Sequence, residues 1–298
     1  MQKIVPNLWF HRNAAEAAEF YRTAFPGTQL IDTTYYPQEG LPDFQRDFAG
    51  EVLTIDLEIA GFRFTLINAG DEFTPNPAIS FMVAFDEHSD GDARQRLDET
   101  WEALGEGGTE LMPLTEYPFS SYYGWMQDRY GVSWQLSLID STDGAGSRPS
   151  VYPSLLFGGA EQNRAAKAKE RYLVAFPDSA DGATALYSEQ TGPAPEGAVM
   201  YTDFQLEGQW FAAMDSGVEQ DFTFTPGISL LVNAADQAEI DQLWDQLSHV
   251  PEAEQCGWCT DEFGVSWQIA PENMNELMDR DGAYAKLMDM KKIEIDRF

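Results

Sequence analysis

The chain repeats itself, and this internal repeat constrains its fold more than any other feature of the sequence. Blocks from the first half return in the same order in the second half. The matched blocks are PNLWF at 6–10 with PSLLF at 153–157, DLEIAGFRF at 56–64 with DFQLEGQWF at 203–211, and GWMQDRYGVSWQL at 124–136 with GWCTDEFGVSWQI at 257–269. Because the order of the blocks is kept, we expect two homologous domains in tandem.

The length agrees with this division, since 298 residues correspond to about two domains of ordinary size. The polar segment DSTDGAGSRP has the composition of a linker. We expect a first domain at 1–140, a linker at 141–150, a second domain at 151–270 and a helical tail at 271–298. The tail carries apolar residues at roughly helical spacing, namely Met274, Leu277, Met278, Leu287, Met288 and Met290.

Within a copy, the periodicity alternates between that of strands and that of helices. Residues 4–10 predict a strand, and a helix follows from Asn13, which we expect to act as its N-cap in a capping box with Glu16. Further segments complete the first copy: strands at 28–34, 51–60, 62–68, 78–85, 109–112, 121–127 and 132–138, and a helix at 91–105. Each domain thus has the order βαβββ twice, which predicts an α+β fold with helices packed on one face of a curved sheet.

The composition excludes several classes of protein. With 18 basic and 50 acidic residues the formal net charge is -32, so nucleic acids and anionic membrane surfaces are excluded as partners. An apolar content of 43% is too high for a disordered acidic chain. We find no apolar run of transmembrane length and no signal-peptide pattern at the N-terminus, and we expect a cytoplasmic location.

These residues resemble a known superfamily. The βαβββ order, the helix AAEAAEFY at 14–21 and the DRYG at 128–131 are similar to vicinal oxygen chelate proteins, which include glyoxalase I, extradiol dioxygenases and bleomycin-resistance proteins. More narrowly, both copies resemble the PhnB-like family, often labelled 3-demethylubiquinone-9 3-methyltransferase. Its marks are GFRF at 61–64, NPAISF at 76–81, CGW at 256–258 and VSWQ at 265–268.

The resemblance implies tandem glyoxalase-like domains, each of two βαβββ modules, with curved mixed sheets and helices on the outer face. A methyltransferase reaction is disfavoured, because we find no glycine-rich turn after a strand and the strand order differs from that of a doubly wound sheet. Family membership alone is weak evidence for any one reaction.

The resemblance also implies a divalent metal, held by His or Gln in the first strand of a module and by Glu in its last strand. Those positions fall at Pro6 and Pro153, and at Gln135 and Gln268. Proline offers no donor atom and glutamine is a weak ligand, so we expect neither a metal nor another cofactor. The three histidines do not rescue a site, since His11, His88 and His249 show no ligand spacing.

Alternation in the strand at 51–60 places Asp56 and Glu58 on one face, and the second copy does the same with Asp203 and Gln205. In the resembled fold this face lines a concave cavity, where an aspartate can act as a general base or a hydrogen-bond anchor. A solvated face of an open sheet is an equal alternative. The candidate cavity-lining residues are Asp56, Glu58, Trp125, Gln135, Asp203, Gln205, Cys256, Trp258 and Gln268.

Two residue patterns leave alternatives open. Cys256 and Cys259 form a C-x-x-C, but the first copy has Tyr123 and Met126 there, so a redox pair is disfavoured, while Cys256 can still line a cavity. The tryptophans of the closing blocks can stack on a planar ligand or pack in the core: Trp125, Trp134, Trp258 and Trp267.

We therefore expect a protein that binds a small molecule in a concave cavity without the usual metal. The alternative is a metal-dependent lyase, isomerase or dioxygenase of glyoxalase type with a non-standard site, and a third hypothesis is a scaffold without a ligand. Catalytic residues are unknown at this stage. A tandem chain can pair its two domains internally, so we expect a pseudo-symmetric internal dimer, as a monomer or as a homodimer.

Overall fold

A computed structural model describes residues 2–143 and 148–298. The first copy contains helices α1 (Ala14–Ala24) and α2 (Ala93–Gly105). Its strands are β1 (Ile4–His11), β2 (Gln29–Tyr35), β3 (Val52–Ile59), β4 (Phe62–Ala69), β5 (Ile79–Asp86), β6 (Thr109–Tyr117), β7 (Ser120–Gln127) and β8 (Ser133–Ile139). The order βαβββ, twice, is therefore confirmed for this copy.

The second copy departs from the expected order in its last module. Its helices are α3 (Ala165–Ala175) and α4 (Gln237–Leu247), and its strands are β9 (Val151–Phe157), β10 (Ser179–Leu186), β11 (Val199–Leu206), β12 (Gln209–Asp215), β13 (Ile228–Ala234), β14 (Trp258–Thr260) and β15 (Ser266–Pro271). Where β6 stands in the first copy, a 3-10 helix at Pro251–Ala253 replaces the strand. The second copy is ten residues shorter here, because the matched residues Trp101 and Gly124 are 23 positions apart and Trp244 and Gly257 only 13. The amides of His249 and Val250 still reach the Thr260 carbonyl.

Two sheets form the centre of the molecule, and each takes one module from each domain. The seven-stranded sheet has the order β14-β15-β13-β1-β4-β3-β2, and the eight-stranded sheet has the order β10-β11-β12-β9-β5-β8-β7-β6. The domains meet where β1 pairs antiparallel with β13 and β5 pairs antiparallel with β9. The chain therefore builds between its own two halves the pairing that the repeat predicts.

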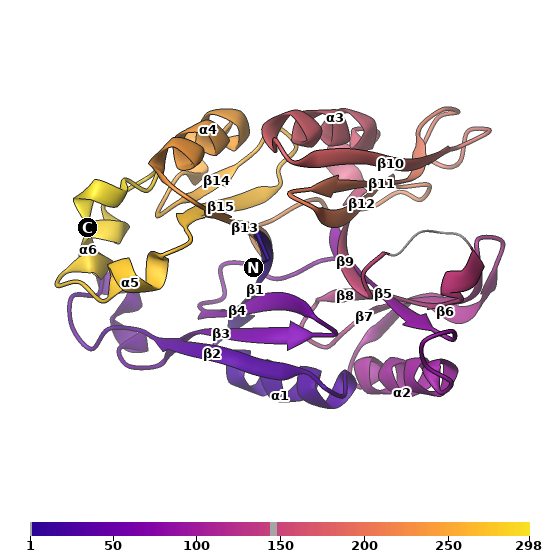
Figure 1. Cartoon of the computed structure of the whole chain (residues 1–298), viewed down its shortest axis with the longest axis horizontal. Coiled ribbons are helices and arrows are strands. Elements are labelled where there is room, and N and C mark those ends of the chain that lie inside the picture. Colours follow the sequence, from indigo (N-terminus) through magenta and orange to yellow (C-terminus); the bar gives the residue numbers. More distant parts are fainter. Residues whose placement is uncertain (1, 144–147) are drawn as a thin grey trace.

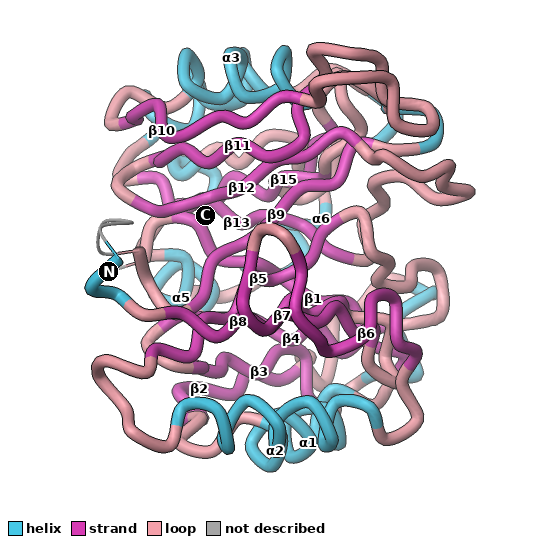
Figure 2. Tube along the Cα trace, turned by 90° about the vertical axis from the view of Figure 1, so that its right-hand side faces the viewer, coloured by secondary structure: helices cyan, strands magenta, loops and turns pink. Residues whose placement is uncertain are grey.

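The four long helices lie outside the sheets. Helices α1 and α2 run along one side of the molecule and α3 and α4 along the opposite side, with the strands between them (Figure 1). Figure 2 looks onto the eight-stranded sheet, whose strands are stacked between α3 at one end and α1 and α2 at the other. Large aromatic residues fill the space between helices and sheets, including Tyr21, Phe64, Phe81, Trp134, Tyr172, Phe204, Phe211 and Trp267.

Helix α1 begins differently from the sequence-based expectation. The Asn13 side chain makes no capping hydrogen bond to the described residues, so the capping box with Glu16 is wrong. The first helical amide, that of Ala14, instead donates to Oδ1 of Asn68 at 3.2 Å, and Glu16 accepts from the Tyr130 hydroxyl. A side chain from β4 thus takes over the capping role, and the repeat of this arrangement in α3, where Asp215 accepts from Ala165, shows that it belongs to the fold.

A buried aspartate ties each first helix to the hairpin of the following module. Asp128 accepts hydrogen bonds from the Tyr21 hydroxyl at 2.9 Å, from Nε1 of Trp134 at 2.9 Å and from two backbone amides of its own turn. Asp261 repeats the arrangement with Tyr172 and Trp267. These aspartates account for the repeated D-x-x-G-V-S-W segment as an element of the fold.

The C-terminal tail forms two short helices, α5 (Met274–Met278) and α6 (Ala283–Met288). Its residues Leu277, Met290 and Ile293 are buried in the apolar core. The tail also reaches the first domain, because the Tyr284 hydroxyl donates to Oε1 of Gln45 at 2.7 Å. The tail therefore closes one end of the molecule (Figure 1).

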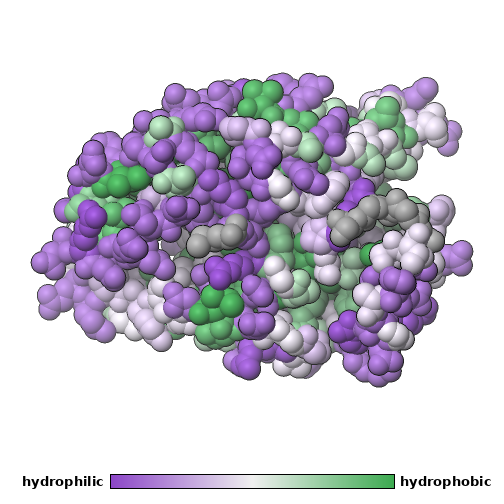
Figure 3. Space-filling model, viewed as in Figure 1, coloured by the Kyte–Doolittle hydropathy of each residue, from purple (hydrophilic) through white to green (hydrophobic). Residues whose placement is uncertain are grey.

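The visible surface in Figure 3 is mainly hydrophilic, with apolar side chains in small patches. Within the described ranges, the helices are all too short or too polar to cross a membrane. A surface of this kind agrees with the large acidic excess of the sequence.

Candidate functional site

Each sheet has one face against the long helices and an opposite face, which we call its open face. In β3, Ile55, Leu57 and Ile59 are buried against the helices, so Asp56 and Glu58 lie on the open face. The same parity holds in β11, where Phe204 and Leu206 face the core and Asp203 and Gln205 face the other way.

The strand register aligns polar residues in one row across each open face. In the seven-stranded sheet, paired neighbours run from Asp56 to Thr65, Asn7, Ser229, Ser266 and Thr260. In the eight-stranded sheet, they run from Asp203 to Ala212, Ser154, Ser80, Ser133 and Gln127. We call these the central rows, and they correspond residue by residue in the repeat.

A second row lies beside each central row. In the seven-stranded sheet this second row contains Glu58, which is paired with Arg63. It also contains Gln268, which is paired with Leu231 on one side and with Trp258 on the other. In the eight-stranded sheet it consists of Gln205, Trp210, Tyr152, Met82, Gln135 and Trp125. Eight of the nine residues that the sequence suggested as cavity-lining therefore lie in these rows, four in each sheet.

Cys256 is the candidate that the structure sets apart. It occupies the turn before β14 with a φ of 53°, and its thiol lies 3.5 Å from Sδ of Met288 in the tail. Cys259 is buried on the helix side of β14, and both cysteines are free. The four tryptophans also separate: Trp134 and Trp267 are in the core, whereas Trp125 and Trp258 are on the open faces.

The first-strand ligand positions inferred from the resemblance, Pro6 and Pro153, do not lie on the open faces. Pro6 pairs with the buried Leu230 and shares the helix-facing side of β1 with Leu8 and Phe10. The side chain that enters the central row is Asn7, and in the second copy Ser154 replaces Pro153 in the same way. Successive residues of a strand point to opposite faces, so both neighbours of Pro6 lie on the open face, Asn7 in the central row and Val5 in the row of Gln268.

Several polar atoms of the rows are buried without a hydrogen-bond partner among the described residues. They are Oδ1 of Asn7 and Oγ of Ser266 in the seven-stranded sheet, and Oγ of Ser133, Oγ of Ser154 and Nε1 of Trp125 in the eight-stranded sheet. Buried polar groups in folded proteins are nearly always hydrogen-bonded to protein or water. Their concentration on the two open faces marks these faces as the candidate site.

Glutamine side chains beside the central rows are fixed by hydrogen bonds that the sequence did not reveal. Gln135 accepts from the Tyr123 hydroxyl at 2.6 Å and donates to Oγ of Ser80 at 2.7 Å. Gln268 donates to Oγ of Ser229 at 2.9 Å. The repeat of the block I-S at 79–80 and 228–229 was the signal that could have identified both serines.

The aspartates at the ends of the two central rows have different surroundings. Asp203 is fully buried and accepts from Nε and Nη2 of Arg148 at 2.9 and 2.5 Å, and from the Ala183 amide. Asp56, within the described part of the chain, accepts only from the Thr65 hydroxyl, at 2.7 Å. Burial raises the pKa of Asp56, and the Thr65 hydrogen bond partly offsets this.

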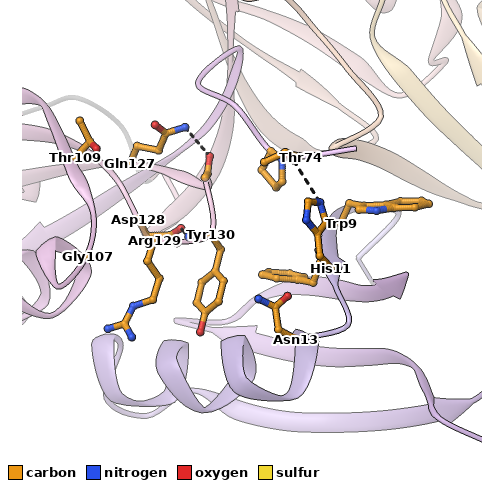
Figure 4. Close-up of a pocket in the computed structure, with 13 residues that line it drawn as sticks. Trp9, His11, Asn13, Thr74, Gly107, Thr109, Gln127, Asp128, Arg129 and Tyr130 are labelled. Carbon is orange, nitrogen blue, oxygen red and sulfur yellow. Dashed lines mark hydrogen bonds between the residues drawn. The ribbon is translucent and has the colours of Figure 1, made fainter. Parts of the chain in front are cut away.

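A pocket of about 440 Å³ lies at the end of β1 and touches the rows only at Gln127, the last residue of the eight-stranded central row (Figure 4). His11, the last residue of β1, lines it, with Nε2 2.7 Å from the Phe73 carbonyl oxygen. Arg129 and Tyr130 line the other side but are engaged with Glu106 and Glu16. We do not place the candidate site here, because most of its polar groups already have partners within the chain.

The residues of the open faces do not fit a divalent metal ion. On the eight-stranded face the Asp203 carboxylate is already paired with Arg148. On the seven-stranded face Asp32 lies opposite Asp56 on β2 and Glu58 follows on β3, without a histidine or cysteine beside them among the described residues. The other side chains offer neutral hydroxyl and amide oxygens, which are weak ligands for such an ion when few carboxylates accompany them. Over the whole described part of the chain, we find no group of three or more His, Cys, Asp and Glu side chains arranged to hold a metal.

Paired sheets built from βαβββ modules of two domains define the glyoxalase class of fold. A point mutant of glyoxalase I from Zea mays has this fold, with a TM-score of 0.51 and 12% identity over 92% of this chain and 95% of that one. The similarity extends to the tandem arrangement, and at this identity it concerns the fold alone.

The family follows from the sequence. The model of the 3-demethylubiquinone-9 3-methyltransferase family matches residues 2–137 and again 149–270, and the chain belongs to this family. A PhnB protein from Bacillus cereus is 33% identical over 46% of this chain and 100% of its own, with a TM-score of 0.39. Protein PA1353 from Pseudomonas aeruginosa is 22% identical over 47% of this chain and 99% of its own, also with a TM-score of 0.39. Comparison with curated proteins gives no match in sequence.

Proposed function

We propose that the protein binds polar small molecules on its two open faces, without a metal. The observation that carries this proposal is the set of buried polar atoms in the rows that have no partner in the described chain, such as Oδ1 of Asn7 and Oγ of Ser154. Leaving such groups unsatisfied costs about 1–3 kcal/mol each, and a bound ligand that supplies partners recovers this free energy.

The family description names a methyl transfer, and the fold of this chain does not support that reaction. The usual nucleotide-type site of such enzymes lies at the carboxyl ends of parallel strands in a doubly wound sheet. Here both sheets are mixed, and the candidate groups lie in the middle of their faces. Binding without methyl transfer is therefore the function that we favour.

A thermal-shift screen of small polar compounds tests the proposal. We expect ligands that raise the melting temperature of the wild type. A ligand of the eight-stranded sheet should lose this effect in Ser154→Ala, and a ligand of the seven-stranded sheet should lose it in Asn7→Ala. Thr223→Val is the matched control, because its Oγ1 is also buried without a partner in the described chain but does not belong to the rows. Hits that bind all these variants equally would place the site elsewhere.

Metal analysis separates the proposal from a glyoxalase-type enzyme. Protein purified without chelator and then dialysed is expected to contain no stoichiometric transition metal. One equivalent of Zn, Ni, Mn or Fe per domain after dialysis would contradict the metal-free mode of binding.

A further inference from the structure

The two open faces are related by the repeat, so one of them can show what the other binds. Asp203 and Asp56 occupy the same position in the two copies, at the end of the central row. Asp203 forms an ion pair with the guanidinium group of Arg148. Asp56 can therefore be compared directly with Asp203.

The Arg148 site shows the chemistry that this position recognises. Two nitrogens of the guanidinium donate to the same carboxylate oxygen of Asp203, and Cζ lies 5.0 Å from the centroid of the Trp210 ring. The hydroxyl of Tyr201 lies 3.3 Å from the same oxygen. A charged hydrogen bond and an aromatic neighbour together make a guanidinium site.

Asp56 keeps the carboxylate, but none of the described cationic side chains is hydrogen-bonded to it as Arg148 is to Asp203. Within the described residues, its only hydrogen bond is the one from Thr65 and it forms no ion pair. Asp32 lies directly opposite on β2, and Glu58 follows on the same face of β3, so the local charge is negative despite Arg63 nearby. A half-buried carboxylate with negative neighbours is stabilised by a cation.

Two further features of this face indicate a ligand. Asn7, in the same row, is only 4% exposed, and its Oδ1 has no partner in the part of the chain that the structure describes. Asn7 lies two strands from Asp56, or about 10 Å at the usual strand spacing. Next to the row is an open cleft of about 320 Å³ lined by Gln2, Glu58, Gly61 and Arg63.

We propose that the seven-stranded sheet binds a small molecule that carries a guanidinium or amine cation, with the cation on Asp56 and a hydrogen-bond donor directed at Asn7. The Arg148–Asp203 pair is the internal model of the contact between carboxylate and cation. The aromatic neighbours of that pair, Trp210 and Tyr201, are replaced at this face by Arg63 and Thr54. This inference rests on the proposed function, because it names the class of ligand for one of the two open faces.

A titration of the full chain followed by two-dimensional amide NMR tests the inference. Methylguanidinium chloride is the probe, and N-methylurea, which is similar in shape but neutral, is the control at equal ionic strength. We expect saturable shifts of the Asp56, Thr65 and Asn7 amides with methylguanidinium and none with N-methylurea.

Three variants sharpen the result. Asp56→Asn should weaken binding at least about tenfold, because the charged hydrogen bond is lost. Asp47→Asn, the same change at an exposed residue, should leave binding unchanged. Arg63→Gln should tighten binding about two- to threefold, since a like charge near the site is removed.

The inference is overturned if methylguanidinium causes no saturable shift at Asp56 and Thr65, or if Asp56→Asn binds it as well as the wild type. In that case the face is a solvated acidic surface. Neutral compounds from the thermal-shift screen that still depend on Asn7 would then leave the proposed function standing, so the two failures are distinguishable.

Discussion

At the scale of single residues, the open faces contain groups that do not stabilise the fold. The Ser154 hydroxyl is fully buried in the central row and has no partner among the described residues. Ser80, its neighbour across the ladder, is equally buried, but its hydroxyl accepts from Gln135. The two serines therefore form a matched pair in which only one makes a hydrogen bond within the described chain.

We expect Ser154→Ala to raise the free energy of unfolding by about 1 kcal/mol in the absence of ligand, because a desolvated hydroxyl is removed at little cost in volume. Ser80→Ala should lower it by about 1 kcal/mol, since Gln135 loses its acceptor. Urea unfolding at equilibrium measures both values. A loss in Ser154→Ala as large as that in Ser80→Ala would show that the Ser154 hydroxyl has a structural partner.

The buried aspartates of the turns give a prediction about pH. Burial raises the pKa of Asp128 to about 6, although hydrogen bonds from Trp134, from Tyr21 and from the turn amides act in the opposite direction. In the unfolded chain an aspartate has a pKa of about 3.9. Between these two pKa values the Asp128 carboxyl is protonated in the folded state but not in the unfolded chain. The stability that this protonation contributes is therefore complete below about pH 4 and is lost as the pH rises through about 6.

We therefore expect the stability advantage of the wild type over Asp128→Asn to be larger at pH 5 than at pH 7.5. Urea unfolding at the two pH values measures it. Asp261→Asn should show the same trend, because burial also raises the pKa of Asp261 in the matching network. An advantage that grows with pH in both variants would mean that the networks hold these groups as carboxylates.

At the scale of secondary structure, the tail is fixed by its packing and not by its helices, which are short. Ile293 is 1% exposed and lies against Gly257, which has a φ of 85°. The amides of Cys256 and Gly257 donate to the carbonyls of Met290 and Lys291. Residues beyond α6 thus hold the turn before β14 in place.

Replacing Ile293 by Ala should lower the free energy of unfolding by about 2–4 kcal/mol, as for other buried aliphatic side chains. Val174→Ala, a similar truncation at a residue that is 70% exposed, should change it by less than about 0.5 kcal/mol. Chemical denaturation followed by tryptophan fluorescence measures both. Equal effects would contradict the view that the tail is part of the second domain's core.

Secondary structure was largely predictable because apolar periodicity reports directly which face is buried. The failures have local causes. The cap of α1 depends on Asn68, which is distant in sequence. The strand is missing before β14 because the second copy has ten fewer residues between its helix and its closing block. The central rows were only partly predictable, since alternation fixes the face of Asp56 but not the neighbour across each ladder. Pro6 was assigned from the resemblance, which did not reveal that its side chain lies on the helix-facing side of β1.

At the scale of the whole molecule, the net charge of -32 opposes the compact state. The acidic residues lie in both domains, and the surface in Figure 3 is hydrophilic over both halves. Raising NaCl from 0.05 to 0.5 M, which shortens the Debye length to about 4–5 Å, should therefore raise the melting temperature. Sorbitol at equal osmolality is the control for effects unrelated to charge. A melting temperature that falls with salt would mean that attractive ion pairs outweigh the repulsion.

The exchange of modules between the sheets makes the two domains interdependent. A domain by itself would expose two strand edges, those of β1 and β5 in the first copy and those of β9 and β13 in the second. Such edges pair readily with other strands, and much of the apolar surface around them needs a partner module to cover it. We propose that one chain satisfies these edges internally and is a monomer.

This proposal predicts that residues 1–143 and 148–298, produced as separate polypeptides in one cell, assemble into a 1:1 complex with about the mass of the intact chain, 33.4 kDa. Each half alone should form homodimers or aggregate, because a second copy is then the only source of the missing edge. Light scattering after gel filtration measures these masses. Ser229→Pro, which removes a ladder hydrogen-bond donor opposite Asn7, should weaken the complex. Glu196→Pro, at an exposed position in the turn closed by the Ala198 amide and the Pro195 carbonyl, should not, because proline fits the second position of such a turn. Folded, monomeric halves would show that the shared sheets are a consequence of tethering and that each domain can close its own edge.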